Sequence, residues 1–253
     1  MTDFWRHPVV PRLKAFLEQA VLLTADLARY VERSLVAAQA SLQAGAFSRA
    51  LELLSAAEAG GSGALDELAS ARVDLLRGHI AFASSPDSDT PVLLLNAARR
   101  LEPFDVEVAR ETYLMAFGAV SVAGTAAGGD VLMEICHAAQ ALPAAQGDRR
   151  PLGLLLHGLA LLTTEGHAAA TPTLQRAAQA LADIAVDDVL RWGWVATAAS
   201  TAVWDDEAFY VISTRQVQLV EQAAAGAEGS CARPTTCSPR SAWRRSPSAP
   251  AAS

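Results

Sequence analysis

The side chains best suited to chemistry in this sequence are five histidines and three cysteines. His79, His157 and His167 fall in different segments. None of them has a histidine, cysteine or carboxylate four residues further on, the spacing at which two ligands share one helix face. Cys136 and His137 are adjacent, so on a helix they point about 100° apart and are poorly placed to chelate one ion. The spacing therefore indicates neither a metal site nor a cysteine–histidine nucleophile pair.

The most conspicuous polar cluster is Trp204-Asp205-Asp206-Glu207. Its carboxylates could bind a cation or a basic partner. The alternative is structural: Asp205 caps a following helix, Asp206 and Glu207 interact with that helix's dipole, and Trp204 packs beneath. We favour the structural interpretation. We also expect two further tryptophans to belong to the core between repeats: Trp192 and Trp194.

Lysine is almost absent, and this bears on nucleotide binding. A phosphate-binding loop requires the pattern G-x-x-x-x-G-K-[ST]. The only lysine, Lys14, follows Pro11-Arg12-Leu13 with no glycine nearby. No Ser/His/Asp arrangement can be argued from spacing either. We therefore expect a protein that is not an enzyme, does not bind ATP and needs no cofactor.

Charge is unevenly distributed along the 253 residues, whose formal net charge is -7. Residues 223–253 carry four arginines and one glutamate, so the first 222 residues carry about -10. An acidic body argues against direct binding of nucleic acid, which needs a basic face. The sequence also lacks a convincing bilayer span and an N-terminal apolar h-region, and its three cysteines give no disulfide framework. These features predict a cytoplasmic protein that does not interact with membranes.

The elements that must position any site are predicted to be helices. Apolar residues recur at helical spacing almost throughout, and no stretch alternates with period two for long enough to predict a strand. Alanine, the best helix former, supplies about a fifth of the chain. We expect about eleven helices, separated by turns rich in Gly, Ser, Pro and Asp. The predicted ranges are 11–23, 26–45, 47–58, 64–84, 91–101, 104–123, 129–142, 151–165, 167–182, 188–203 and 206–222.

One window has the spacing of a tetratricopeptide repeat. Small residues would let the two helices of a hairpin approach, a glycine would form the turn, and apolar side chains would fill the gap between repeats. Looser versions follow roughly 33 to 40 residues later. The expected fold is all-α: an antiparallel helix-hairpin array forming a tetratricopeptide-like, right-handed solenoid. The residues of the first window are Ala40, Gly45, Ala46, Phe47, Ala50, Leu54 and Ala57.

Three regions are expected along the chain: an irregular N-terminus at 1–10, a helical-repeat domain at 11–222, and a disordered tail at 223–253. The tail is rich in Pro, Ser, Arg and Ala, and it would be either a frame-shifted product or a natural disordered segment. The array would begin on an unpaired apolar helix, so we expect truncation at both ends. Exposed apolar ends would favour self-association.

A candidate binding groove follows from repeat position. In arrays of this type the first helix of each hairpin lines the concave face. Gln39 and Gln43 from one unit, and Arg72 and His79 from the next, would face it. Such polar side chains suggest a surface for a peptide or an effector, and the alternative is a solvated face.

Several segments resemble the large LuxR-type, ATP-binding transcriptional regulators of high-GC bacteria, which share their layout with the maltose regulator. The resemblance covers about 11–222. The segments are ALELLSAAEA (50–59), LDELASARVDLLRGHIAFASS (65–85), LLLNAARRLEPFDVEVARETYLMAF (93–117), LLLHGLALLTTEGHAAATPTLQRAA (154–178) and LRWGWVATAASTAVWDDEAFYVISTRQVQLV (190–220).

Members of that family consist of a nucleotide-binding module, a helical-repeat region and a C-terminal helix-turn-helix. The resemblance concerns only the middle part. It implies a non-catalytic sensor or coupling region, which in the intact family member would respond to a protein, a peptide or a small-molecule inducer. The alternative is a free-standing tetratricopeptide-like scaffold that binds a peptide or protein partner.

Overall fold

The computed structural model describes residues 9–24, 26–60, 65–84, 87–124, 129–143, 151–182 and 186–231. In these residues the chain is all-helical, with eleven helices and no strand, as predicted. The helices are α1 (Val9–Leu22), α2 (Leu27–Gln43), α3 (Phe47–Gly60), α4 (Glu67–Ser84), α5 (Thr90–Leu101), α6 (Val106–Ala123), α7 (Gly129–Ala141), α8 (Pro151–Thr164), α9 (His167–Ala182), α10 (Val186–Ala202) and α11 (Asp206–Cys231).

The largest departure from the predicted helices is at the C-terminal end. α11 was expected to end at residue 222, yet it continues to Cys231, so residues 223–231 are helical and not part of a disordered tail. Alanines at 223–225 and 227 explain the extension, because alanine has the highest helix propensity. At the other end, α1 begins at Val9, inside the segment expected to be irregular. The remaining tail, 232–253, lies outside the described residues.

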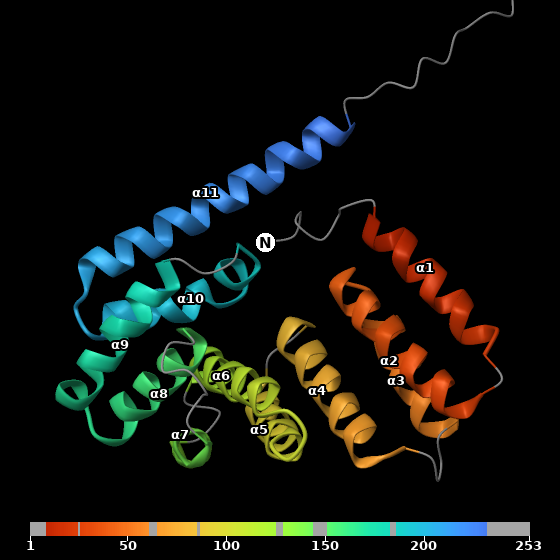
Figure 1. Cartoon of the computed structure of the whole chain (residues 1–253), viewed down its shortest axis with the longest axis horizontal. Helices are drawn as coiled ribbons and strands as arrows, with labels where there is room; N and C mark the ends of the chain where they lie inside the picture. The colour runs from red at the N-terminus through yellow and green to blue at the C-terminus, as the bar shows by residue number, and fades with distance from the viewer. Residues whose placement is uncertain are drawn as a thin grey trace, which may run out of the picture.

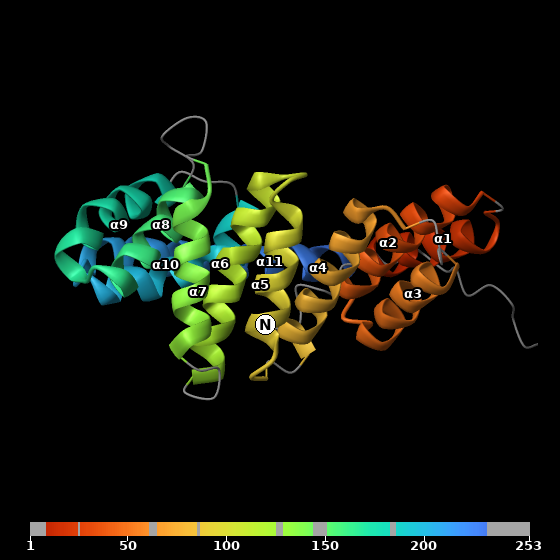
Figure 2. The ribbon, with the colours of Figure 1, turned by 90° about the horizontal axis from the view of Figure 1, so that it is seen from below.

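Helices that follow one another in the sequence pack against one another. Figure 1 shows them along a curved path from α1 to α9, with α10 and α11 returning across the inner side of the curve. Figure 2 shows the same succession from below, with α1 to α4 at one end and α8 and α9 at the other. Among the described residues, no helix is both long enough and apolar enough to cross a membrane.

In two of the helix hairpins, a glycine on the first helix lies directly against a leucine on the second. A Cβ atom on Gly78 of α4 would lie 2.6 Å from Cδ2 of Leu94 on α5. A Cβ atom on Gly158 of α8 would lie 2.5 Å from Cδ2 of Leu174 on α9. In both pairs the leucine follows the glycine by sixteen residues, and the two glycines are eighty residues apart. The first hairpin has buried Ala38 and Leu54 at the same spacing.

The turns of two hairpins have the same backbone conformation and hydrogen bond. Gly45, between α2 and α3, has φ +70°, and the next amide, of Ala46, donates to the carbonyl of Ser41. Trp204, between α10 and α11, has φ +58°, and the next amide, of Asp205, donates to the carbonyl of Ser200. This bonding ends a helix on a left-handed residue, normally glycine. The last hairpin therefore has a tryptophan in a glycine position.

The core has two main parts. Buried side chains of α1 to α4 form one cluster, and those of α5 to α11 form a larger one. Ala71, Leu101 and Ala109 join α4, α5 and α6 where the two parts meet. Arginine–carboxylate pairs also bridge neighbouring helices, including Arg77 of α4 with Glu58 of α3 at 2.6 Å. Burial is thus continuous along the array.

Candidate binding surface

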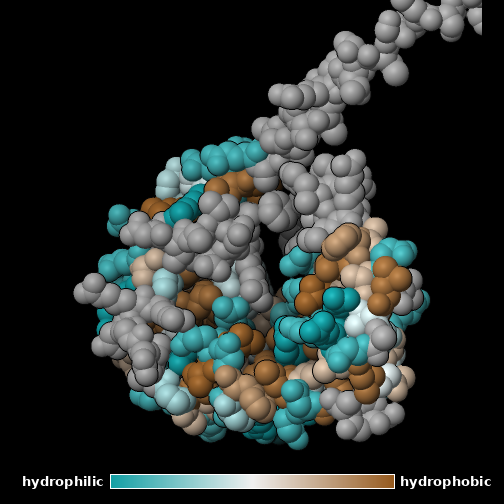
Figure 3. All heavy atoms as spheres, turned by 45° about the vertical axis from the view of Figure 1, so that its right-hand side comes forward, coloured by the Kyte–Doolittle hydropathy of each residue, from teal (hydrophilic) through white to brown (hydrophobic). Residues whose placement is uncertain are grey.

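An aromatic contact joins parts of the chain that are distant in sequence. The rings of Phe82 on α4 and Trp194 on α10 stack with centroids 6.3 Å apart and planes inclined by 23°. In Figure 1, α10 lies on the inner side of the curve, toward α4 and α6. Figure 3 shows the surface hollowed between the N-terminal helices, which come forward in this view, and the C-terminal helices. The stacked rings tie the two arms of the curve together.

Gly118 of α6 makes room for this contact. A Cβ atom at residue 118 would lie 2.6 Å from Cη2 of Trp194, so only glycine lets the indole rest on the helix. Trp194 nevertheless remains 38% exposed, whereas Trp192 on the same helix is buried. The prediction that both tryptophans are core is therefore confirmed for Trp192 and wrong for Trp194. An accessible indole held against a second ring is a good apolar contact for a ligand.

Two of the four predicted groove residues, Arg72 and His79, lie on α4, the helix that carries Phe82. Arg72 is exposed, and His79 is partly buried. With Phe82 they are spaced by seven and three residues, so all three lie on one face of the helix. Gln39 and Gln43 are exposed one turn apart on α2, which packs against α4. The assignment of all four to one groove stays a prediction.

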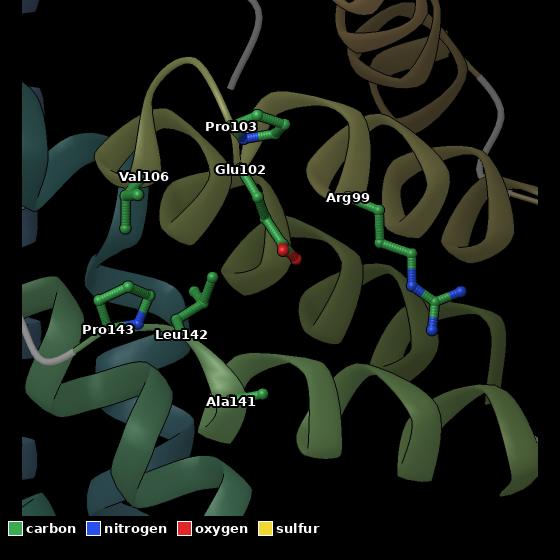
Figure 4. A pocket seen from close by; sticks show the side chains of 7 residues that line it. All are labelled: Arg99, Glu102, Pro103, Val106, Ala141, Leu142 and Pro143. Carbon is green, nitrogen blue, oxygen red and sulfur yellow. The ribbon is translucent and has the colours of Figure 1, made fainter.

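A second depression lies where α5 ends, α6 begins and α7 ends (Figure 4). Its volume is about 330 Å³, and it is lined by Arg99, Glu102, Pro103, Val106, Ala141, Leu142 and Pro143. The side chain of Glu102 points into the space between the end of α5, next to Pro103, and the end of α7, next to Pro143. Its carboxylate accepts a hydrogen bond from the hydroxyl of the fully buried Tyr113. Burial and the neighbouring Glu102 raise the pKa of Tyr113, which keeps the phenol protonated as the donor.

The polar groups around this depression are already engaged in holding helices together. Arg99 pairs with Glu134 of α7 at 2.8 Å, and this carboxylate raises the pKa of the guanidinium. Arg110 of α6, almost wholly buried, donates to the carbonyl of Pro143 at 2.8 Å and so holds the end of α7. The depression is thus a joint between α5, α6 and α7, and we do not assign a ligand to it.

Cys136 and His137, although adjacent in the sequence, lie in different environments. Cys136 is buried and His137 is exposed, and burial raises the pKa of the Cys136 thiol, which disfavours the nucleophilic thiolate. Within the described ranges, no group of three or more histidine, cysteine, aspartate and glutamate side chains could hold a metal ion.

The cluster at residues 204–207 combines one correct prediction and one wrong one. Asp205 caps α11, because its carboxylate accepts the amide of Ala208 at 3.0 Å. Trp204 was expected to pack beneath the cluster, yet its side chain is 85% exposed. The left-handed backbone of Trp204 turns the indole into solvent, and no helix of the described chain covers it.

Sequence reasoning missed the pairing of Phe82 with Trp194. The two residues are 112 positions apart, and neither lies in a local motif. Comparison of the chain with models of protein families, with curated proteins and with solved structures returned no match. A function must therefore be argued from the surface itself.

Replacing Gly118 by alanine should displace the indole of Trp194 from Phe82. The new methyl group would overlap the ring, and the loss of stacking outweighs the better helix propensity, so we expect about 1 kcal/mol of destabilisation. Tryptophan emission and near-UV circular dichroism should change. Gly129→Ala is the matched control, because nothing lies within 4 Å of its added Cβ. Equal spectra for Gly118→Ala and the wild type would contradict the tight contact.

Proposed function

We propose that this chain is the helical-repeat region of a LuxR-type transcriptional regulator and that it acts by binding, with no chemistry of its own. Its helices would form a tetratricopeptide-like, right-handed solenoid whose inner face receives a protein, a peptide or a small-molecule inducer. The proposal includes no direct contact with nucleic acid and a cytoplasmic location.

The observation that carries the proposal is the repeated hairpin contact beside an accessible aromatic pair. Gly78 with Leu94 and Gly158 with Leu174 have the same spacing and the same close contact, which supports repeated units of one kind. Phe82 and Trp194 add an apolar contact that only the curved array creates. Arg72 and His79 on the same face of α4 would add polar contacts at its edge.

A ligand on the inner face would act through a shift of conformational population. It would bind across α4, α6 and α10, which belong to different parts of the curve, and so favour the conformation in which they are close. Such a change could alter contacts with neighbouring domains without any covalent step. A conformational effect of this kind needs differential affinity for the two states, and the stacked rings would provide it.

Binding to the inner face can be tested with a thermal-shift screen of short peptides and small sugars. A ligand at about a hundred times its Kd should stabilise the protein by about 2.7 kcal/mol, seen as a higher Tm. The shift should disappear in Trp194→Ala and persist in Phe104→Ala, an exposed aromatic residue in the α5–α6 turn. Shifts of equal size in both variants would place the ligand elsewhere and contradict the proposal.

The flanking coding DNA distinguishes the regulator from the free-standing scaffold. If the chain is part of a regulator, translation of the flanking DNA in all frames should reveal a phosphate-binding loop upstream and a helix-turn-helix downstream. Their absence would favour a scaffold that binds a peptide or protein partner.

A further inference from the structure

The contact between α4 and α10 joins helices that are far apart along the array. In the described part of the chain, every helix pair with an extensive contact is either consecutive or separated by a single helix. Five helices lie between α4 and α10, yet Phe82 and Trp194 stack on each other (Figure 1). The two arms of the curve therefore meet through individual side chains and not through an interface of the kind that joins neighbouring helices.

The repeat pattern explains why a glycine faces Trp194. A small, buried residue recurs every forty positions, on four helices: Ala38 on α2, Gly78 on α4, Gly118 on α6 and Gly158 on α8. Sixteen residues further on, three of these four units have a buried leucine on the next helix: Leu54, Leu94 and Leu174. In the units of Gly78 and Gly158 this leucine provides the atoms nearest to the glycine.

The unit formed by α6 and α7 departs from this pattern. Its residue 134 is a glutamate, whose exposed side chain pairs with Arg99 of α5 at 2.8 Å, so α7 supplies no leucine to Gly118. The three atoms nearest to a Cβ at residue 118 all belong to Trp194, at 2.6, 2.9 and 3.8 Å. Trp194 of α10 thus fills the space beside the small residue, as a leucine of the hairpin's own second helix does in the other units.

We propose that Phe82, Gly118 and Trp194 form a latch that closes the curved array, and that its release lets α10 and α11 move away from α4 and α6. In the open conformation α10 keeps its contacts with α8, α9 and α11. Because few side chains change partners, the open conformation is a minor population of about 0.1–10% in the wild type. The latch regulates the binding surface on α4, α6 and α10, and in that role it rests on the proposed function.

The separation of the two arms can be measured in the full chain without any ligand. Nitroxides at Ser55→Cys on α3 and Gln218→Cys on α11, both exposed positions, report it by double electron–electron resonance. Cys231 and Cys237 are replaced by serine, and the buried Cys136 is retained. The latched protein should give one narrow distance distribution. Removing the indole by Trp194→Ala should raise the ratio of open to closed molecules by more than about tenfold, seen as a second population at longer distance.

Gly118→Ala is an independent test, because it keeps both rings and places a methyl group where the indole lies. It should lengthen the distance in the same direction as Trp194→Ala. Phe82→Ala/Trp194→Ala should open the array no further than Trp194→Ala alone, because the two rings act as a pair. The matched controls are Trp204→Ala, which removes an exposed indole outside the latch, and Gly129→Ala, which adds a methyl group in open space. Both should keep the wild-type distances.

Unchanged distances in folded Trp194→Ala and Gly118→Ala proteins would overturn the latch. Equal opening in Trp204→Ala would also overturn it, because closure would then not depend on the stacked rings. If far-UV circular dichroism shows that Trp194→Ala does not fold, the distance in Gly118→Ala decides alone.

The latch and the proposed function can fail separately. If the distance is unchanged in Trp194→Ala but stabilisation by a ligand is lost, the latch is wrong and the binding surface stands. If the array opens as expected and the thermal-shift screen finds no ligand, the latch stands and the result counts against the proposed function.

Discussion

Replacing Leu174 by alanine should lower the free energy of unfolding by about 2–5 kcal/mol. Leu174 is buried against Gly158, at a close contact between α8 and α9, and it belongs to the larger core cluster. Removing its isobutyl group leaves a cavity that two closely packed helices cannot easily fill. The measurement is equilibrium unfolding in urea, followed by far-UV circular dichroism.

Enlarging the small residue of the same contact should also destabilise the protein, because it overpacks the space that Leu174→Ala would leave empty. Gly158→Ala adds a methyl group 2.5 Å from Leu174 Cδ2 and 3.3 Å from its backbone nitrogen, so we expect a loss of about 1–3 kcal/mol. In Gly158→Ala/Leu174→Ala the added methyl group occupies part of the cavity. The double variant should therefore lose less stability than the sum of the single variants. Strict additivity would mean that the two residues do not contact each other in solution.

The helices could be predicted from the sequence because their signals are local. Apolar residues at helical spacing and the turns between them depend on neighbours a few positions away, and the predicted ends lie within three residues of those observed, except at the end of α11. At that end the composition changes at residue 223, but a run of alanines does not stop a helix. The prediction there gave too much weight to composition and too little to propensity.

The candidate surface could not be predicted in the same way. Trp194 has a helical neighbourhood typical of core residues, and only the curvature of the array decides that its ring meets Phe82 and stays accessible. The need for glycine at residue 118 depends on the same curvature, because the atom that a Cβ would meet belongs to α10. Contacts between residues so far apart in the sequence leave no periodic or motif signal in a single chain.

Trp204 shows how a turn can mislead a prediction from residue type. Its bulk suggested a buried anchor, whereas the hydrogen bonds of the turn require a left-handed residue whose side chain leaves the helix. The equivalent position in the first hairpin is Gly45, which meets this requirement without strain. The exposure of Trp204 therefore follows from its left-handed position in the turn, which it shares with Gly45, and not from its neighbours in the sequence.

Exchange of side chains at these two turns should change stability in opposite directions. Gly45→Ala should cost about 1–2 kcal/mol, because a Cβ atom is strained at φ +70°. Trp204→Gly relieves the same strain, and after the added entropy of glycine in the unfolded chain it should gain about 0.5–1 kcal/mol. That gain corresponds to a Tm higher by about 1–4 °C at a concentration low enough to keep the protein monomeric. Trp204→Ala is the control, because it removes the exposed indole yet keeps the strained Cβ, and it should not stabilise the protein. If Trp204→Ala were as stabilising as Trp204→Gly, the exposed ring and not the backbone would be the source of the effect.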